Sequence, residues 1–119
     1  MNQKNYTSSL QYLKKAIKIF NRYHDKLWQA EALLRRGKIY LARNKFSKAL
    51  IFIKDCIKIK TKVKDKLGVI KGYDMLGDLY LKQDLNRKAI RSFKKALETA
   101  HIIHHEFYIK KFQEKLETL

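Results

Sequence analysis

The sequence contains no proline and only four glycines among its 119 residues. Proline breaks a helix interior and glycine weakens it, so a chain poor in both can form long uninterrupted helices. All-β proteins need these residues in their turns, which excludes that class. No apolar run reaches the roughly 18–20 residues of a membrane span, and the N-terminus lacks the apolar segment of a signal peptide. We therefore expect an all-α, soluble, cytoplasmic protein.

Cysteine occurs once, at position 56, which excludes an internal disulfide. Signatures of catalysis are missing too: there is no glycine-rich phosphate loop and no Ser-His-Asp order. His101 and His105 have the i, i+4 spacing that can chelate a metal on a helix, but we expect them at a turn, where that geometry is lost. We predict no enzyme activity, no metal and no cofactor, and we assign Cys56 to packing.

Acidic residues are scarce as well. The chain has 28 Lys and Arg against 11 Asp and Glu, a formal net charge of +17. Such a charge speeds encounters with any polyanion, whether nucleic acid, anionic membrane or acidic protein. Only six of the basic residues are arginine, whose planar fork is suited to phosphates and guanines. The composition favours general attraction to polyanions over specific recognition of nucleic acid.

What the chain does have is an internal repeat of forty residues. The stretch Gly37-Lys38-Ile39-Tyr40 returns as Gly77-Asp78-Leu79-Tyr80, and His24-Asp25-Lys26-Leu27 returns as Lys64-Asp65-Lys66-Leu67. A fixed period of about 20–50 residues is typical of a solenoid. The repeat therefore predicts a stack of similar structural units.

Within each repeat, apolar residues recur every three or four positions, as they do on the buried face of a helix. Asp25 and Asp65 are predicted N-caps, because a short carboxylate can accept hydrogen bonds from the free N–H groups of a helix start. Asn44 and Asp84 stand at equivalent positions where helices end. The predicted helices cover about 6–22, 26–43, 45–61, 66–82, 86–101 and 106–117.

The repeated residues resemble the tetratricopeptide repeat family, in its long, forty-residue variety. One copy reads Leu33, Gly37, Tyr40, Ala49, Ile53 and Cys56, and the next reads Tyr73, Leu76, Gly77, Tyr80, Ala89, Phe93 and Ala96. The resemblance implies an all-α, right-handed solenoid of antiparallel helix pairs, with about six helices. It implies one domain over 1–119, made of a half-repeat helix (5–25), two repeats (26–64 and 65–104) and a capping helix (105–119). Arg36 departs from the pattern, in a slot that is normally leucine.

In that family, the first helices of the pairs line a concave groove that binds a peptide or a partner's helix. The resemblance therefore implies a non-enzymatic protein-interaction module, either complete or a fragment of a larger regulator or scaffold. The groove carries both signs of charge, which suits a mixed-charge ligand or an apolar anchor; the other interpretation is a merely solvated face. Its candidate residues are Glu31, Leu34, Arg35, Lys38, Lys71, Asp74, Met75, Asp78, Lys111 and Lys115.

A second candidate surface is a run of lysines on the outer, second-helix face. Three of them have i, i+4 spacing, a like-charge arrangement that costs about 0.2–0.5 kcal/mol per pair. The alternative function is thus a basic binder of nucleic acid or of an anionic surface. A hydrated helix end is the simpler interpretation, because no aromatic residue for base stacking interleaves the run. The run consists of Lys54, Lys58, Lys60, Lys62 and Lys64.

The first predicted helix has no preceding helix to pair with in this chain. Its second apolar set, Tyr12, Ile19 and Tyr23, is expected to be exposed, and an uncovered apolar side marks an interface. Either the chain is part of a longer array, or this end binds another copy or a partner. Trp28, at the start of the next helix, either packs there, which is the default expectation, or joins such an interface.

Overall fold

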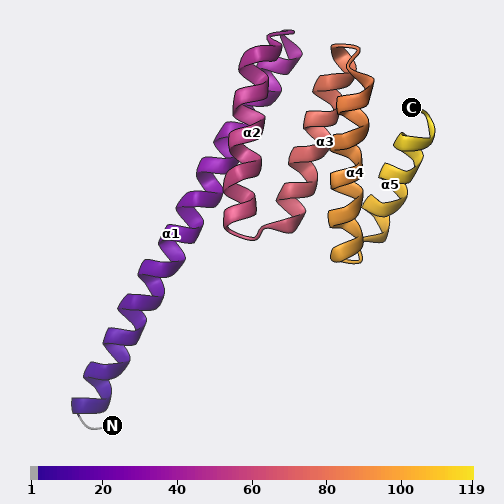
Figure 1. Ribbon diagram of the computed structural model, residues 1–119. Coiled ribbons are helices and arrows are strands. Elements are labelled where there is room, and N and C mark those ends of the chain that lie inside the picture. The colour runs from indigo at the N-terminus through magenta and orange to yellow at the C-terminus, as the bar shows by residue number, and fades with distance from the viewer. Residues whose placement is uncertain (1–2) are drawn as a thin grey trace.

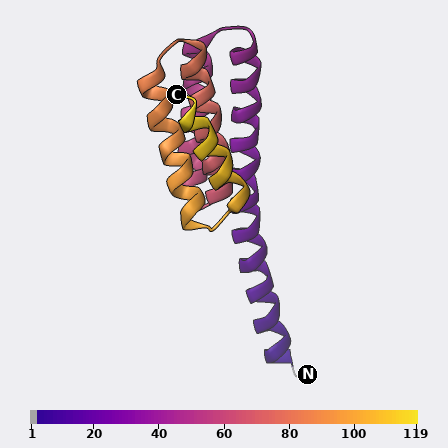
Figure 2. The ribbon, with the colours of Figure 1, turned by 90° about the vertical axis from the view of Figure 1, so that its right-hand side faces the viewer.

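The computed structural model describes residues 3–119, and their side chains from residue 8 onward. Successive helices run antiparallel and stack side by side into a short solenoid (Figure 1). The N-terminal half of the first helix projects from this stack (Figure 2), so the molecule measures 67 × 31 × 16 Å. No strand occurs in residues 3–119, and none of their helices is long and apolar enough to cross a membrane. The helices are α1 (Gln3–Ala42), α2 (Phe46–Lys62), α3 (Lys66–Lys82), α4 (Asn86–Ile102) and α5 (Glu106–Glu117).

The turns between the helices repeat every twenty residues. In each turn, the N–H after the left-handed residue bonds to a carbonyl five positions earlier, as from Lys45 to Tyr40 at 2.8 Å. This Schellman arrangement satisfies the free carbonyl groups of a helix end. It confirms that Asn44 and Asp84 end helices. The left-handed residues, with φ between 53° and 61°, are Asn44, Lys64, Asp84 and His104.

The prediction of separate helices at about 6–22 and 26–43 was wrong, because α1 runs through both. Asp25 is therefore not an N-cap but lies inside α1. Position 24 belongs to the same twenty-residue series as the turns, yet His24 is helical and His104 is left-handed. Every side chain from residue 8 to 26 is exposed. Without helix packing to offset the cost of a left-handed residue, continuation of the hydrogen-bonded helix is favoured.

The later helices agree with the predicted ones to within one residue at each end. Asp65 is the predicted N-cap of α3, since its Oδ1 accepts a hydrogen bond from the Gly68 N–H at 3.0 Å. Local sequence signals were therefore sufficient to predict the helix ends wherever the turn joins two helices that pack together.

Small residues let the paired helices approach closely. A Cβ at Gly37 would lie 2.8 Å from Ile53 Cγ1, and a Cβ at Gly77 would overlap the Phe93 ring. The core is continuous along the stack. One cluster joins α1, α2 and α3, and the next joins α3, α4 and α5; they contain Leu41, Ala49, Ile53, Ile57, Leu76 and Leu79, and Ile70, Ala89, Phe93, Ala96, Ala100 and Phe112, respectively.

Cys56 belongs to a third cluster, with Ala30 and Leu34 of α1. Burial raises the pKa of the Cys56 thiol to about 11. The thiol is therefore neutral near pH 7 and behaves as a small apolar side chain.

Candidate binding groove

The predicted groove residues lie on α1, α3 and α5, the first helices of their pairs. Leu34 is buried against Cys56, and Met75 packs partly buried on the same cluster. Neither side chain is a free apolar anchor for a ligand. Arg35, Lys38 and Lys71 are exposed.

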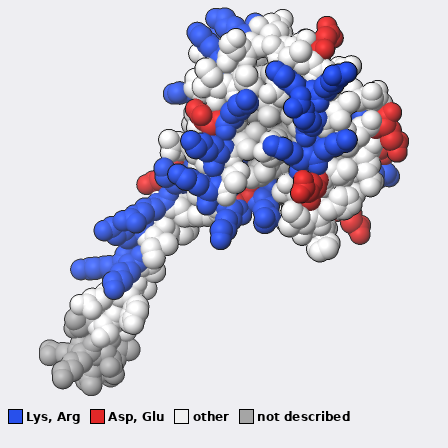
Figure 3. All heavy atoms as spheres, viewed as in Figure 1, with Lys and Arg blue, Asp and Glu red and all other residues white. Residues whose placement is uncertain are grey.

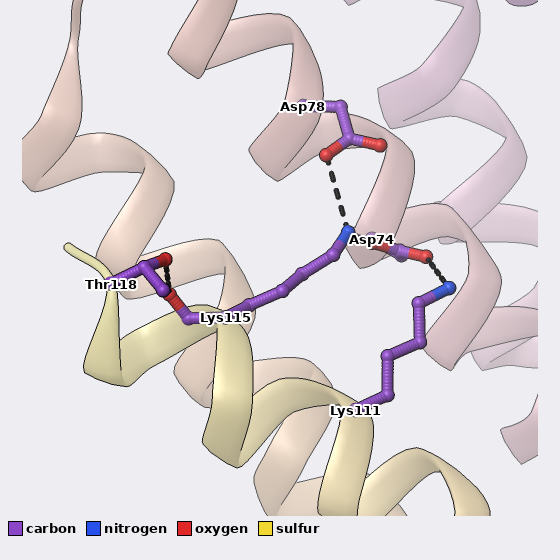
Figure 4. A network of polar contacts seen from close by, with 5 residues as sticks. All are labelled: Asp74, Asp78, Lys111, Lys115 and Thr118. Carbon is purple, nitrogen blue, oxygen red and sulfur yellow. Dashed lines mark hydrogen bonds and ion pairs between the residues drawn. The ribbon is translucent and has the colours of Figure 1, made fainter.

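Four of the other candidates form one ion-pair network between α3 and α5 (Figure 4). Lys111 Nζ lies 2.8 Å from one oxygen of Asp74, and Lys115 Nζ lies 2.5 Å from the other. Lys115 Nζ also lies 3.3 Å from Asp78 Oδ1. This face therefore neutralises much of its own charge while holding the capping helix on the stack.

The same network shifts two pKa values. Burial raises the pKa of the Asp78 carboxyl, and Lys115 only partly counteracts it. Burial alone would lower the pKa of Lys115, but its hydrogen bond to Asp74 and the charges of both aspartates outweigh that effect and raise it. The lysine is thus held in its charged form between the two helices.

Lys60 does not belong to the outer lysine run, which corrects the prediction for this residue. Its side chain is 2% exposed, and its Nζ donates to Glu31 Oε1 of α1 at 2.7 Å. A Cβ at Gly68 would overlap the Lys60 stem, so glycine makes room for the buried lysine. The hydrogen bond from Lys60 lowers the pKa of Glu31. The Glu31 carboxylate is therefore paired with a buried lysine of the same chain and is not an unpaired charge in the predicted groove.

A groove of about 770 Å³ lies between α2 and α4, with α3 as its floor. Basic side chains gather over α2 and α4 in Figure 3. The floor is formed by Ile57, Tyr73, Leu76 and Tyr80. A second hollow, of about 310 Å³, continues the groove and shares Tyr73 with it. Six basic residues form the walls: Lys54, Lys58 and Lys62 on α2, and Lys88, Arg91 and Lys95 on α4.

These wall residues differ from Lys111 and Lys115 of the first-helix face, which are paired with aspartates. None of the six forms an ion pair within the part of the chain that the structure describes. Lys95 Nζ lies 5.5 Å from the centre of the Tyr73 ring, and Lys88 Nζ lies 5.7 Å from that of Tyr80. Such cation–π contacts hold the ammonium groups over the floor. The groove combines uncompensated positive charge with an apolar base.

Comparison with family models gives two matches described as tetratricopeptide repeat, over residues 1–62 and 70–100. The chain belongs to the tetratricopeptide repeat family. The first match includes the projecting half of α1, and the second lies within α3 and α4. No curated protein and no solved structure matches the chain significantly. Tetratricopeptide repeats generally mediate protein–protein interactions, and the chain is of that functional class.

The tetratricopeptide stack explains why the lysines of the predicted run lie in different environments. Second helices of consecutive pairs are neighbours, so the exposed side of α2 faces α4. Lys60 points the other way, into the α2–α1 contact. Of the predicted run, Lys54, Lys58 and Lys62 line the groove, and Lys64 lines its continuation.

Sequence reasoning missed the opposite wall and the floor of the groove. The signal was available, because Lys88, Arg91 and Lys95 have i, i+3, i+7 spacing and so share one helix face. The absence of aromatic residues within the lysine run was also misleading. Tyr73 and Tyr80 come from α3, a different helix of the repeat.

The remaining candidates lie at the ends of the repeats. Tyr12, Ile19 and Tyr23 are exposed along α1, and their role in an interface stays a prediction. Trp28 is 59% exposed, so the expectation that it packs was wrong. His105 caps α5, its Nδ1 accepting a hydrogen bond from the Tyr108 N–H at 3.3 Å.

Proposed function

We propose that this tetratricopeptide repeat protein is an interaction module whose α2–α4 groove binds an acidic segment of a partner protein. The observation that carries the proposal is the set of six wall cations without a carboxylate partner in the described residues, placed over an apolar floor. Opposite charge across an interface speeds association and sets the orientation of the ligand.

The groove has the size and chemistry for a short segment of chain. Its volume of about 770 Å³ lies within the range of about 300–1,000 Å³ that is usual for ligand sites. The half-buried rings of Tyr73 and Tyr80 are the accessible apolar part of the floor and can contact one or two partner side chains, since Ile57 and Leu76 are buried in the core. The lysines on both walls are then placed to pair with flanking Asp or Glu. The expected ligand alternates acidic and apolar residues.

A protein ligand suits the groove better than a nucleic acid. Single-stranded nucleic acids gain affinity by stacking bases on open aromatic faces. Here Lys95 and Lys88 lie over the rings of Tyr73 and Tyr80. Arginine, the usual reader of phosphate and guanine, supplies only one of the six wall cations.

The groove of the first helices, implied by the family resemblance, is the competing site. Its carboxylates are engaged by lysines of the same chain: Glu31 by Lys60, and Asp74 by Lys111 and Lys115. A ligand there would have to displace these ion pairs. The α2–α4 groove imposes no such displacement, which is why we favour it.

The test uses fluorescence anisotropy with a labelled peptide of alternating Glu and Leu. Reversing one charge on each wall, by Lys58→Glu with Arg91→Glu, should raise the Kd at least tenfold. The matched control reverses two exposed cations of the first-helix face, Lys38→Glu with Lys71→Glu, which gives the same net charge. The control should change the Kd by less than about threefold at 0.15 M salt, where charges beyond about 8 Å are screened.

Three results would count against the proposal. Equal loss in both double variants would mean that net charge alone attracts the peptide. Loss in the control alone would assign binding to the first-helix face. Tighter binding of a labelled single-stranded DNA than of the peptide, with a steep salt dependence, would favour nucleic acid as the ligand.

A further inference from the structure

The projecting half of α1 has the sequence of a second helix of a repeat. Forty positions before α2, Leu10, Leu13 and Ile17 occupy the places of Leu50, Ile53 and Ile57. The tetratricopeptide match begins at residue 1 and therefore includes this segment. In the stack, a second helix also packs on the first helix of the following pair, as α2 packs on α3. The side chains of the projecting half, described from residue 8 onward, have no such neighbour among residues 8–119.

One buried contact of the stack has an exposed counterpart one period earlier. Ile53 and Ile57 of α2 are buried with Leu76 and Leu79 of α3. The residues forty positions before these four are Leu13, Ile17, Arg36 and Ile39. In α1, Leu13 and Ile17 are each 57% exposed, and Ile39 is 51% exposed. The chain therefore carries both halves of a helix–helix contact that is not formed.

The two halves cannot meet within one chain, because α1 is continuous through His24. Leu13 and Ile17 lie on one side of that point along the helix, and Ile39 lies on the other. A turn at His24, like those at Asn44 and His104, would be needed to fold α1 back on itself. With a continuous helix, the two halves of this contact can meet only when they belong to different molecules.

We propose that two copies of the chain pair through antiparallel α1 helices, the projecting half of each packing on residues 26–42 of the other. This is an exchange of identical elements between protomers, the relation known as domain swapping. In each copy, residues 26–42 thus pack on the projecting half of the second copy's α1 and not on the projecting half of their own α1. Leu13, Ile17 and Ile39 are then covered on both sides of the two-fold axis.

The α2–α3 contact gives the register of this pairing. A Cβ at Gly72 would lie 3.7 Å from Ile57 Cβ. The residues forty positions before Gly72 and Ile57 are Ala32 and Ile17. This register centres the dimer between residues 24 and 25, so that His24 of each copy lies beside Asp25 of the second copy.

The contact is large enough for a specific dimer. A 40-residue helix is about 60 Å long and about 10 Å wide. In the register above, residues 7–42 of the two helices overlap over about 54 Å. They bury about 1,100 Å², just above the roughly 1,000 Å² expected of a specific interface. The like charge of the two chains opposes association, so salt that screens it should strengthen the dimer.

Disulfide trapping tests the pairing at its predicted register. A Cβ separation of 3.7 Å is within the usual range for a disulfide. In the full chain with Cys56→Ala, the pair Ile17→Cys and Ala32→Cys should form a covalent dimer under mild oxidation. Two controls accompany it. The pair Ile57→Cys and Gly72→Cys should close within one chain, and Ile17→Cys alone should form no covalent dimer.

Each other outcome overturns the proposal. A disulfide between positions 17 and 32 inside one chain would mean that α1 folds back at His24. A covalent dimer from Ile17→Cys alone would place the projecting halves against each other. The double variant Ile17→Cys with Ala32→Cys and the single variant Ile17→Cys can both fail to form a covalent dimer. Sedimentation of the unmodified chain is then decisive. A monomer at 0.1 mM would reject the dimer, and a dimer would reject this register.

A second double variant tests the same interface with substitutions that should leave the stack folded. Leu13→Asp with Ile17→Asp lies in the projecting half, away from the stack, so the stack should remain folded. Sedimentation should show at least a tenfold rise in the dimer dissociation constant, with the far-UV circular dichroism of the stack retained. An unchanged dissociation constant would reject the interface.

Discussion

Ile39 and Leu79 occupy the same position in two repeats, yet one is 51% exposed and the other is fully buried. Their local sequences, Gly-Lys-Ile-Tyr and Gly-Asp-Leu-Tyr, are nearly alike. Leu79 is covered because α2 turns back at Lys64 and lies beside α3. Ile39 is uncovered because α1 does not turn at His24. The environment of a repeat residue thus depends on whether the preceding helix is in place.

The largest expected effect separates these two positions directly. Leu79→Ala should lower the free energy of unfolding by about 2–5 kcal/mol, because it leaves a cavity between α2 and α3. Ile39→Ala should change that of the monomer by less than about 0.5 kcal/mol, as for other exposed sites. Urea denaturation at low protein concentration measures both. Similar losses in the two variants would mean that Ile39 is covered in the monomer.

A smaller difference is expected between the two glycines of the repeat. Gly77→Ala forces a methyl group against the Phe93 ring, and overpacking of this kind costs about 1–3 kcal/mol. Gly37→Ala overlaps a single atom, Ile53 Cγ1 at 2.8 Å, whereas the methyl group at position 77 meets three atoms of the Phe93 ring. At position 37, the gain in helix propensity of about 1 kcal/mol offsets much of the strain. Thermal unfolding should give a clearly lower Tm for Gly77→Ala than for Gly37→Ala, and the reverse order would contradict the packing described above.

The two repeat periods also differ in the burial of a charged residue. Lys60 is buried where its counterpart one period earlier, Phe20, is exposed. Glu31→Gln should lower the unfolding free energy by about 1 kcal/mol at pH 7, a modest value because the Glu31 carboxylate is half exposed and screened.

The Glu31 effect should depend on pH. The folded-state pKa of Glu31 is lowered, so its contribution is complete above the unfolded value of about 4.3. It is lost as the pH falls through the folded pKa. Urea denaturation between pH 3 and 7 should show the wild-type advantage shrinking below pH 4.3. The exposed, equally charged Glu114→Gln is the control and should show little effect at any pH.

The smallest expected effects have opposite signs at two positions of the turn series. Lys64→Gly should stabilise the fold by about 0.5–1 kcal/mol, since glycine adopts the left-handed conformation without strain. His24→Gly should instead weaken α1, by about 1 kcal/mol of helix propensity. Urea denaturation reports the first change, and loss of far-UV circular dichroism reports the second. A gain of helix content in His24→Gly would contradict a continuous α1.

Much of the fold was predictable because it depends on local and periodic signals. The spacing of Gly37 and Gly77 gave the forty-residue unit, Asp65 gave a helix start, and Asn44 and Asp84 gave helix ends. The candidate groove was predictable only in part. The run Lys54, Lys58, Lys62 was predicted as a basic outer face, with a hydrated helix end as the simpler interpretation. The groove that it borders depends on α4 and on two tyrosines of α3. Those residues are far apart in the sequence and meet only through stacking.

The repeat, the helical class and the family all follow from the spacing of small and apolar residues along the chain. Which repeat positions are covered depends instead on how the helices stack. The tertiary structure placed Lys60 inside and Lys58 in a groove, and it kept His24 helical while His104 turns. The physical reason is that a left-handed turn and a buried charge each cost free energy, which only packing against a neighbouring helix can offset.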